Sequence, residues 1–165
     1  RVASEKQADK DVINSGAQHV LVKPGAMYFD STFSFGIIRG GHVDVTVLGA
    51  LQVDEKGNLA SHTVPGKMMP GMGGAMDLVV GAKEVIIATT HTQKGAIKLL
   101  KNINLPATAI NCVDYIVTEL CVIHVTDQGF ELMEIAPGLT VEELQAQTEA
   151  KLIVPADLKE MSILA

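Results

Sequence analysis

The chain has 165 residues, of which 47% are hydrophobic and 19% charged, and its formal net charge is −6. This length suggests one domain with a core of useful size. The chain has no basic cluster and no tryptophan, so it lacks the positive patch and the stacking aromatics of a nucleic-acid-binding protein. No apolar run approaches the roughly 18 residues that span a bilayer, so we expect no contact with a membrane.

The mean hydropathy of +0.27 is high for a soluble domain. Two explanations stay open: parallel strands that are buried on both faces, or surface that belongs to a subunit interface. Cys112 and Cys121 are the only cysteines, and neither has a metal-binding spacing to another cysteine. Two thiols with apolar neighbours fit a reducing compartment, so we expect a cytoplasmic protein without a metal site.

Short apolar runs between turn residues indicate strands, and capped runs with helical spacing indicate helices. In the first part of the chain, the expected elements are a polar arm or short helix at 1–15, a short strand at 19–22, a helix from Asp30 or Ser31 to about Arg39, a strand at 43–48, a hairpin with its turn at 54–58, and a helix at 75–81. Farther along, they are a buried strand at 84–89, a hairpin formed by 115–125 and 130–135, and a helix from the capping box at Thr140 to about Ala150. This order predicts an α/β fold with an open, mostly parallel sheet flanked by helices and a C-terminal β-hairpin and helix, in a single domain over residues 1–165.

The segment 65–77 is dense in glycine and leads into the expected helix at 75–81. Glycine permits positive φ and lets a ligand approach backbone N–H groups, and a helix start adds free amides and partial positive charge. An anion or oxyanion site and a tight structural turn explain this segment equally well. Its spacing matches neither a dinucleotide-binding fingerprint nor a Walker A loop, because Met68 follows Gly66-Lys67. Its methionines could line an adaptable apolar slot or fill a core around the turn: Met68, Met69, Met72 and Met76.

Polar residues follow the expected strand at 84–89. Because α/β proteins place ligands at the carboxyl ends of parallel strands, His91 and Lys94 could line a site, and an ordinary surface loop explains them equally well. Glu119 and Glu134 could be carboxylates with a shifted pKa, but alternation with the charge toward water is the simpler interpretation. His42, which has no histidine or cysteine nearby, is typical of a structural or surface histidine.

Several long motifs occur here in one order: Arg39-Gly40-Gly41-His42-Val43-Asp44, Leu48-Gly49-Ala50-Leu51-Gln52-Val53, Val64-Pro65-Gly66-Lys67 and Gly71-Met72-Gly73-Gly74-Ala75-Met76-Asp77-Leu78. Together they resemble the B (beta) subunit of family I coenzyme A (CoA) transferases of the 3-oxoacid type, which act on succinyl-CoA or acetyl-CoA and acetoacetate. The resemblance runs from about Asp11 to the C-terminus. It implies the α/β fold of the CoA-transferase (NagB-like) class.

The resemblance also implies a ping-pong reaction through covalent catalysis. A glutamate attacks the acyl-CoA thioester to give an acyl-glutamyl anhydride, CoA thiolate converts this to a glutamyl-CoA thioester, and an acceptor carboxylate takes the CoA by the reverse steps. Gly74, with Gly73 beside it, is implied to supply oxyanion amides. Contacts to the CoA substrate are expected from Gly71, Met72, Lys67, His91 and Lys94. An A (alpha) subunit is the expected partner, an acyl-CoA and a short carboxylic acid are the expected substrates, and we expect no tightly bound cofactor.

One departure from the family pattern affects the function directly. The family nucleophile lies in a Ser-Glu-Asn-Gly motif, and this sequence contains no Glu-Asn-Gly; Ser4-Glu5-Lys6 is no substitute. We expect the nucleophile in an upstream part that this sequence lacks, so that this chain alone transfers no CoA. Relatives often have an acidic residue at the position of Thr90, and this difference affects which carboxylate acceptor we expect the protein to prefer. Alternatives are a short-chain acyl-CoA hydrolase, a transferase for another acyl group, and a non-catalytic protein for binding or assembly.

Overall fold

The computed structural model describes residues 1–14, 18–66 and 71–162. Contacts divide the chain into two compact units, residues 1–34 and 35–165. The first unit contains the 3-10 helix η1 (Glu5–Gln7) and isolated bridges from Val2 to Val20 and from Ile13 to His19. The prediction of a strand at 19–22 is therefore wrong, because single bridges form there instead of a ladder of paired residues. The prediction of one domain over 1–165 stays a prediction.

Helix α1 (Ser31–Arg39) has the bounds expected from the sequence. The Asp30 carboxylate accepts a hydrogen bond of 2.8 Å from the backbone N–H of Phe33. This bond satisfies one of the free amides at the start of the helix, which is the usual role of an N-cap residue.

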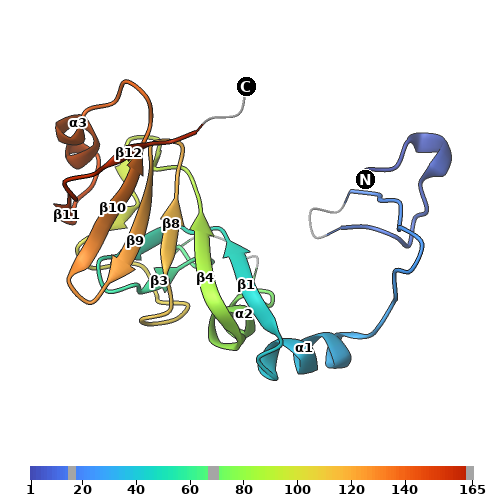
Figure 1. The fold of residues 1–165 in the computed structure, drawn as a ribbon. Coiled ribbons are helices and arrows are strands. Elements are labelled where there is room, and N and C mark those ends of the chain that lie inside the picture. The colour runs from blue at the N-terminus through green and yellow to red at the C-terminus, as the bar shows by residue number, and fades with distance from the viewer. Residues whose placement is uncertain (15–17, 67–70, 163–165) are drawn as a thin grey trace. The chain divides into compact units, whose positions relative to one another are not determined.

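The second unit is built on a seven-stranded sheet with the order β1-β4-β8-β9-β10-β11, in which β12 also pairs with β10 (Figure 1). The strands are β1 (Val43–Leu48), β4 (Ala82–Ala88), β8 (Tyr115–Val117), β9 (Cys121–Thr126), β10 (Gly129–Ile135), β11 (Leu152–Ile153) and β12 (Lys159–Glu160). Four pairings are parallel, β1–β4, β4–β8, β10–β11 and β10–β12, and only β8–β9 and β9–β10 are antiparallel. The expected open, mostly parallel sheet is confirmed.

Two smaller sheets accompany the large one. β2 (Gln52–Asp54), β3 (Leu59–Ala60) and β7 (Leu99–Leu100) form a three-stranded sheet, and β5 (Thr92–Gln93) pairs with β6 (Ala96–Ile97). The turn between β2 and β3 lies where the sequence predicts it. Its buried Asp54 carboxylate accepts hydrogen bonds from the backbone N–H groups of Lys56, Asn58 and Ile103. These bonds compensate the desolvation of the charge, which is otherwise costly.

The last two helices are α2 (Ala75–Gly81) and α3 (Val141–Ala146). α2 has the expected bounds, and the capping box of α3 is confirmed by reciprocal bonds between Thr140 and Glu143. α3 is shorter than predicted. The Gln145 side chain donates to the carbonyl oxygens of Thr148 and Ala150. These bonds give the two carbonyl groups partners beyond the last turn, where the chain is no longer helical.

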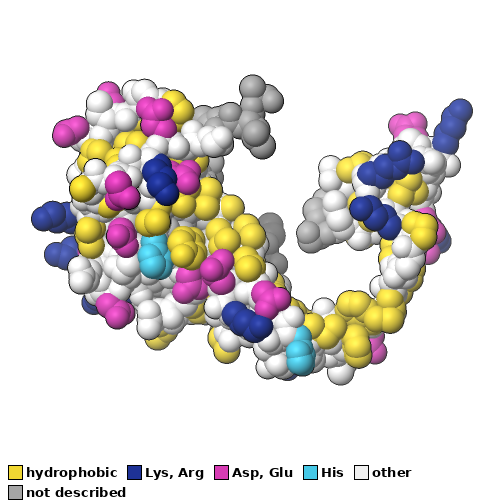
Figure 2. All heavy atoms as spheres, in the orientation of Figure 1, with side chains coloured by type: hydrophobic (Ala, Val, Ile, Leu, Met, Phe, Trp, Pro, Cys, Tyr) yellow, Lys and Arg dark blue, Asp and Glu magenta, His cyan; other side chains and the backbone are white. Residues whose placement is uncertain are grey.

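The core lies on one face of the large sheet. Ile87, Ile116, Ile123 and Leu132 form a row across four strands in direct register, and each is 0% exposed. The opposite face carries exposed hydrophobic side chains on β1, among them Val45 and Val47 at 48% and 61% exposure, and Figure 2 shows apolar side chains gathered over this part of the sheet. Parallel strands are normally covered on both faces, but this face of β1 is exposed. The high proportion of apolar residues in the chain therefore has two sources: a filled core and an uncovered sheet face.

Candidate functional site

The glycine loop, residues 71–74, precedes α2. Gly71 and Gly73 have φ angles of 84° and 56°, a left-handed conformation that favours glycine. The backbone carbonyls of Met72 and Gly74 accept hydrogen bonds from the N–H groups of Ala75 and Leu78. Among the described residues, no acceptor bonds the N–H groups of Gly73 or Gly74. The loop therefore offers two neighbouring amide donors, the kind of group that stabilises an oxyanion.

Helix α1 supports the glycine loop from behind. A side chain placed on Gly74 would meet the Phe35 ring at 3.4 Å, and one placed on Gly81 would meet the Ile38 carbonyl oxygen at 2.3 Å. The Arg39 guanidinium donates to the Asp77 carboxylate at 2.6 Å and lies over the Phe35 ring. This ion pair offsets the negative charge that Asp77 brings to the first turn of α2, next to a loop that is expected to hold an anion.

His91 lies just beyond the carboxyl end of β4 and is 0% exposed. Its Nε2 lies 3.0 Å from Thr148 Oγ1, and its Nδ1 lies 3.1 Å from Thr118 Oγ1. Because the Thr148 hydroxyl donates to the Leu144 carbonyl, it accepts from Nε2–H, which leaves Nδ1 of a neutral ring without a proton next to the Thr118 hydroxyl. Burial lowers the pKa of the imidazole, although the Glu119 carboxylate opposes the shift. His91 is therefore a buried ring whose two nitrogens both have partners within the chain.

Glu119 and Lys98 extend the polar contacts around His91. Both carboxylate oxygens of Glu119 accept from the backbone N–H of His91, at 2.9 and 3.2 Å. The Lys98 ammonium, in a residue only 7% exposed, donates to Thr89 Oγ1. Burial lowers the pKa of Lys98, and the nearby Glu119 carboxylate acts in the opposite direction. Glu119 thus lies in a turn after β8 as a fixed carboxylate, not on a strand as the sequence suggested.

Lys94 lies at the tip of the β5–β6 hairpin, and its side chain is exposed. Its φ of 51° is unusual for a residue other than glycine. Within the described part of the chain, its ammonium has no hydrogen-bond or ion-pair partner. It is available to an anion from outside the chain.

The structure brings some of the expected site residues together and leaves others apart. Gly71, Met72, Gly73 and Gly74 form one loop before α2, whereas His91 and Lys94 follow the carboxyl end of β4. Lys67, Met68 and Met69 lie outside the described residues. Met76 lines a cavity of about 520 Å³ together with Val79, Val80 and Ile110, which favours the interpretation of an apolar slot for this methionine.

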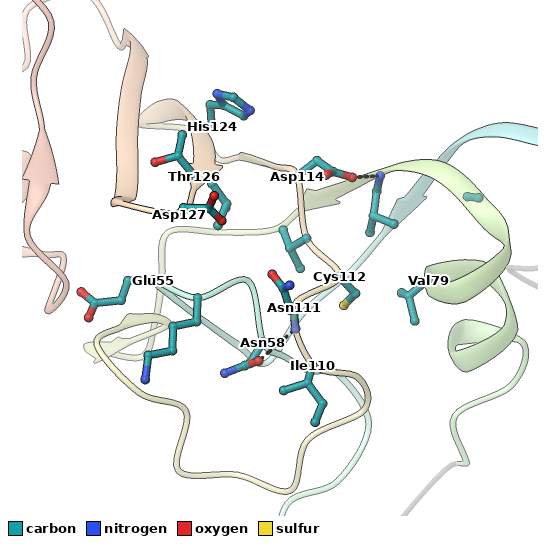
Figure 3. Close-up of a pocket in the computed structure, with 15 residues that line it drawn as sticks. Glu55, Asn58, Val79, Ile110, Asn111, Cys112, Asp114, His124, Thr126 and Asp127 are labelled. Carbon is teal, nitrogen blue, oxygen red and sulfur yellow. Dashed lines mark hydrogen bonds between the residues drawn. The ribbon is translucent and has the colours of Figure 1, made fainter.

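A larger cavity of about 880 Å³ lies at the amino end of β4, between the β2–β3 turn and the β9–β10 turn (Figure 3). None of the expected site residues lines it. Its carboxylates come from Glu55, Asp114 and Asp127, and a single lysine, Lys56, lies among them. Because negative charges repel phosphate groups, this cavity is unsuited to a CoA moiety.

Sequence reasoning missed the partners of His91. Thr118 lies 27 residues away from His91 and Thr148 lies 57 residues away, and no spacing rule connects such positions. Lys98 gave no signal, because a lysine usually faces water. Among the described residues, no group of three or more histidine, cysteine or acidic side chains is placed to hold a metal ion. No helix in the same part of the chain is long and apolar enough to cross a membrane.

Comparison with known proteins shows the family. The family model of the coenzyme A transferases matches residues 1–147. The chain is 51% identical over 159 residues to the beta subunit of the acetate CoA-transferase of Haemophilus influenzae, covering 96% of this chain and 71% of that protein. It is 41% identical over 148 residues to the B subunit of the succinyl-CoA:3-ketoacid coenzyme A transferase of Helicobacter pylori, covering 89% of this chain and 72% of that protein.

A solved structure agrees with the sequence comparisons. The crystal structure of an acyl-CoA transferase from Escherichia coli O157:H7 superposes with a TM-score of 0.76 at 26% identity, covering 92% of this chain and 33% of that chain. The present chain therefore spans about a third of the length of that solved protein. Sequence and fold lead to the same assignment: this chain belongs to the coenzyme A transferase family, among the beta (B) subunits of family I.

Proposed function

We propose that this chain is the part of a short-chain CoA-transferase that stabilises the oxyanion and contacts CoA, and that it works with a glutamate nucleophile from outside these residues. The transferase moves CoA between a short acyl-CoA and a carboxylate, with a 3-oxoacid as the expected partner substrate. The observation that carries the proposal is the pair of amides at Gly73 and Gly74, which bond to no acceptor among the described residues, on a loop whose Gly74 packs against Phe35 of α1.

The chemistry needs such donors at each addition step. When the glutamate carboxylate attacks the thioester carbonyl, the π electrons move to the carbonyl oxygen and form an oxyanion. The oxyanion collapses and the C–S bond breaks. CoA departs as the thiolate, and the acyl-glutamyl anhydride remains. Thiolate attack on the glutamyl carbonyl gives a second oxyanion, whose collapse releases the acyl carboxylate and leaves a glutamyl-CoA thioester. Amides of Gly73 and Gly74 at about 2.7–3.1 Å from that oxygen would stabilise both states.

The partner and the acceptor follow from the relatives. Proteins that are named as beta or B subunits imply a second, A-type subunit, and we propose that this chain requires one. The relatives' names include acetate and 3-ketoacids, so we propose acetate and acetoacetate as the acceptors to test first. The cytoplasmic location and the absence of a tightly bound cofactor stay predictions.

A reconstituted assay tests the function. The complete protein that contains this chain is combined with an A-type subunit, then supplied with acetoacetyl-CoA or succinyl-CoA. Acetoacetyl-CoA is offered with acetate, succinyl-CoA is offered with acetate or acetoacetate, and each donor is also offered with water alone. The new acyl-CoA and free CoA are quantified by chromatography. The proposal predicts transfer to a carboxylate well above the rate of hydrolysis. Hydrolysis that is equally fast without any carboxylate would show a thioesterase, and no turnover of any donor would show a non-catalytic protein.

A further inference from the structure

Lys98 is a buried cation that has no part in the chemistry described so far. It lies between β6 and β7 and is 7% exposed, and its carbonyl oxygen accepts from the backbone N–H of Val53 at 2.9 Å. Lysine is almost never this buried unless its charge is paired. The burial of this ammonium therefore calls for an anion that compensates its charge.

The Lys98 ammonium has one hydrogen-bond partner among the described residues. Its Nζ donates to Thr89 Oγ1, and the Thr89 hydroxyl in turn donates to the carbonyl oxygen of Ala50 at 3.2 Å. An ammonium has three N–H donors, so two of them have no acceptor in the part of the chain that the structure describes. No carboxylate in this part of the chain forms an ion pair with Lys98. Removing a charge from water in this way is costly unless an anion compensates it.

Glu119 is the nearby carboxylate, but its oxygens are bonded to another group. Both oxygens accept from the backbone N–H of His91, at 2.9 and 3.2 Å. Glu119 acts on Lys98 only through space, where it opposes the lowering of the lysine pKa by burial. Lys98 thus keeps free donors beside a carboxylate that does not accept from them.

The hydroxyl that holds the ammonium lies at the carboxyl edge of the large sheet. Thr89 directly follows β4, and Ala50 lies two residues beyond the end of β1, the parallel neighbour of β4. Open α/β sheets bind ligands in the crevice outside the carboxyl ends of their strands. A cation in a residue that is 7% exposed is reached more easily by a small anion than by a bulky phosphate group. The carboxylate of a short acid has both the size and the charge that this position requires.

We propose that Lys98 binds the carboxylate of the short acid that accepts CoA, and that Thr89 is a positioning residue that orients the Lys98 ammonium. The inference rests on the proposed function, because it assumes a carboxylic acid as a substrate. It deepens that function by assigning the acceptor carboxylate to one side chain. Lys98 supplies charge-assisted hydrogen bonds and takes no part in making or breaking covalent bonds.

Lys98→Met tests the assignment, because methionine keeps an unbranched side chain and removes the charge. The complete protein with its A-type subunit is first converted to glutamyl-CoA with acyl-CoA, freed of the released acid, and then given acetate. We expect the half-saturating acetate concentration for discharge of glutamyl-CoA to rise about 10-fold to 100-fold, as for lost charge-assisted hydrogen bonds. Discharge by hydroxylamine, a neutral nucleophile, should keep its rate. Lys101→Met, at an exposed lysine, is the matched control.

The stability of the Lys98 variants separates substrate binding from a structural role. Replacing a buried charge by an apolar side chain is often neutral or stabilising, so Lys98→Met should not lower the urea midpoint of unfolding. Lys98→Gln, which can still donate to Thr89, should weaken acetate binding as Lys98→Met does. A large loss of stability together with an unchanged response to acetate in Lys98→Gln would show a structural lysine.

Glu119→Gln gives a change of the opposite sign. It keeps an oxygen acceptor for the His91 N–H and removes a negative charge near Lys98. The half-saturating acetate concentration should therefore fall, by about twofold to fivefold, because a source of repulsion is removed. Damage to the site would not tighten the binding of its substrate, so weaker acetate binding in this variant would count against the assignment.

The positioning role of Thr89 is tested by a double-mutant cycle. Thr89→Val removes the hydroxyl that accepts from Lys98 and should raise the half-saturating acetate concentration about threefold to tenfold. This effect should disappear in the Lys98→Met background, and Thr89→Ser, which keeps the hydroxyl, should restore most of the affinity. An equal rise in both backgrounds would refute the positioning role.

Three results would overturn the carboxylate site: an unchanged response to acetate in Lys98→Met, an equal loss with hydroxylamine, or an equal loss in Lys101→Met. Ligand-observed NMR titration with acetate and acetoacetate separates this test from that of the proposed function. If no glutamyl-CoA formed, the proposed function would be wrong. Carboxylate binding that is about tenfold weaker in Lys98→Met would still support the site, and unchanged binding would still refute it.

Discussion

At the scale of single residues, the proposed stabilisation of the oxyanion depends on the backbone amide of Gly74. Its φ of −86° is near the range of proline, and none of the described residues accepts a bond from its N–H. Gly74→Pro therefore removes one amide donor, and Gly74→Ala keeps it while adding a methyl group near Phe35. We expect kcat of the assembled enzyme to fall about 100-fold to 1000-fold for the proline variant.

The alanine variant should lose less than about tenfold in kcat, since its donor remains. Steady-state kinetics with one acyl-CoA and one acceptor gives both values. Equal losses in the two variants would mean that crowding against Phe35, and not the amide, decides the rate.

His91 carries the second residue-scale claim, which concerns stability. Its pKa in the folded chain is lowered from the usual 6.5 by burial. The unfolded chain therefore binds the proton more readily, and the free energy of unfolding should fall as the pH drops below about 6.5 through the folded pKa. Urea unfolding at pH 7.5 and pH 5.5 measures this dependence.

The matched variants are His91→Gln and His42→Gln. His91→Gln should reduce the difference between the two pH values, and at pH 7.5 it should lower the free energy of unfolding by about 1–3 kcal/mol, because Thr118 and Thr148 lose a partner. His42 is exposed, so His42→Gln should leave the pH dependence as it is. An unaltered pH dependence in His91→Gln would refute the burial explanation.

At the scale of the elements, the contact of α1 with α2 fixes the glycine loop. Gly81 lies so close to α1 that an added methyl group would meet the Ile38 carbonyl oxygen at 2.3 Å. Gly81→Ala should therefore lower the free energy of unfolding by about 2–3 kcal/mol through overpacking. Gly36 lies in α1 with no atom within 4 Å of the same position.

Gly36→Ala is the control for the element-scale prediction. It should raise the free energy of unfolding by about 0.5–1 kcal/mol, because alanine loses less backbone entropy in a helix. Denaturant unfolding of both variants gives the comparison. A Gly81→Ala chain as stable as the Gly36→Ala chain would show that the two helices do not pack closely in solution.

Some helices and strands have the bounds predicted from the sequence, and others do not. Helix α2 and strand β1 have the bounds predicted from local signals, since glycine breaks and valine alternation act over a few residues. Residues 115–125 were expected as one strand, but Thr118 turns the chain and divides them into β8 and β9. The Thr118 hydroxyl accepts from the N–H groups of Leu120 and Cys121, a turn contact that hydrophobic patterning does not reveal.

The candidate site was predictable in part for the same reason. The glycine loop is a local motif, and the structure retains it as one unit. The buried polar contacts in this region join His91 to Thr118 and Thr148, and Lys98 to Thr89, and these residues meet only after the sheets have formed. Short strands such as β5, β6 and β11 escape detection because two residues contain no periodicity.

At the scale of the whole molecule, two features indicate a chain that acts with other protein. The sheet face at Val45 and Val47 is exposed, although parallel strands are normally covered on both sides. We propose that the glycine loop stabilises a negative charge on the substrate, and the sequence contains no Glu-Asn-Gly from which the family nucleophile could act. Both features fit our proposal that residues outside this chain complete the site.

CoA transfer by the 165-residue chain, alone and within the complete protein, tests the central claim most directly. The same donor and acceptor are given to the purified chain and to the complete protein, each with and without an A-type subunit. The formation of the new acyl-CoA is measured in every mixture. We expect transfer only in mixtures that contain both the Glu-Asn-Gly segment and the A-type subunit. Robust transfer by the isolated chain would contradict the account, because it would require a nucleophile within residues 1–165.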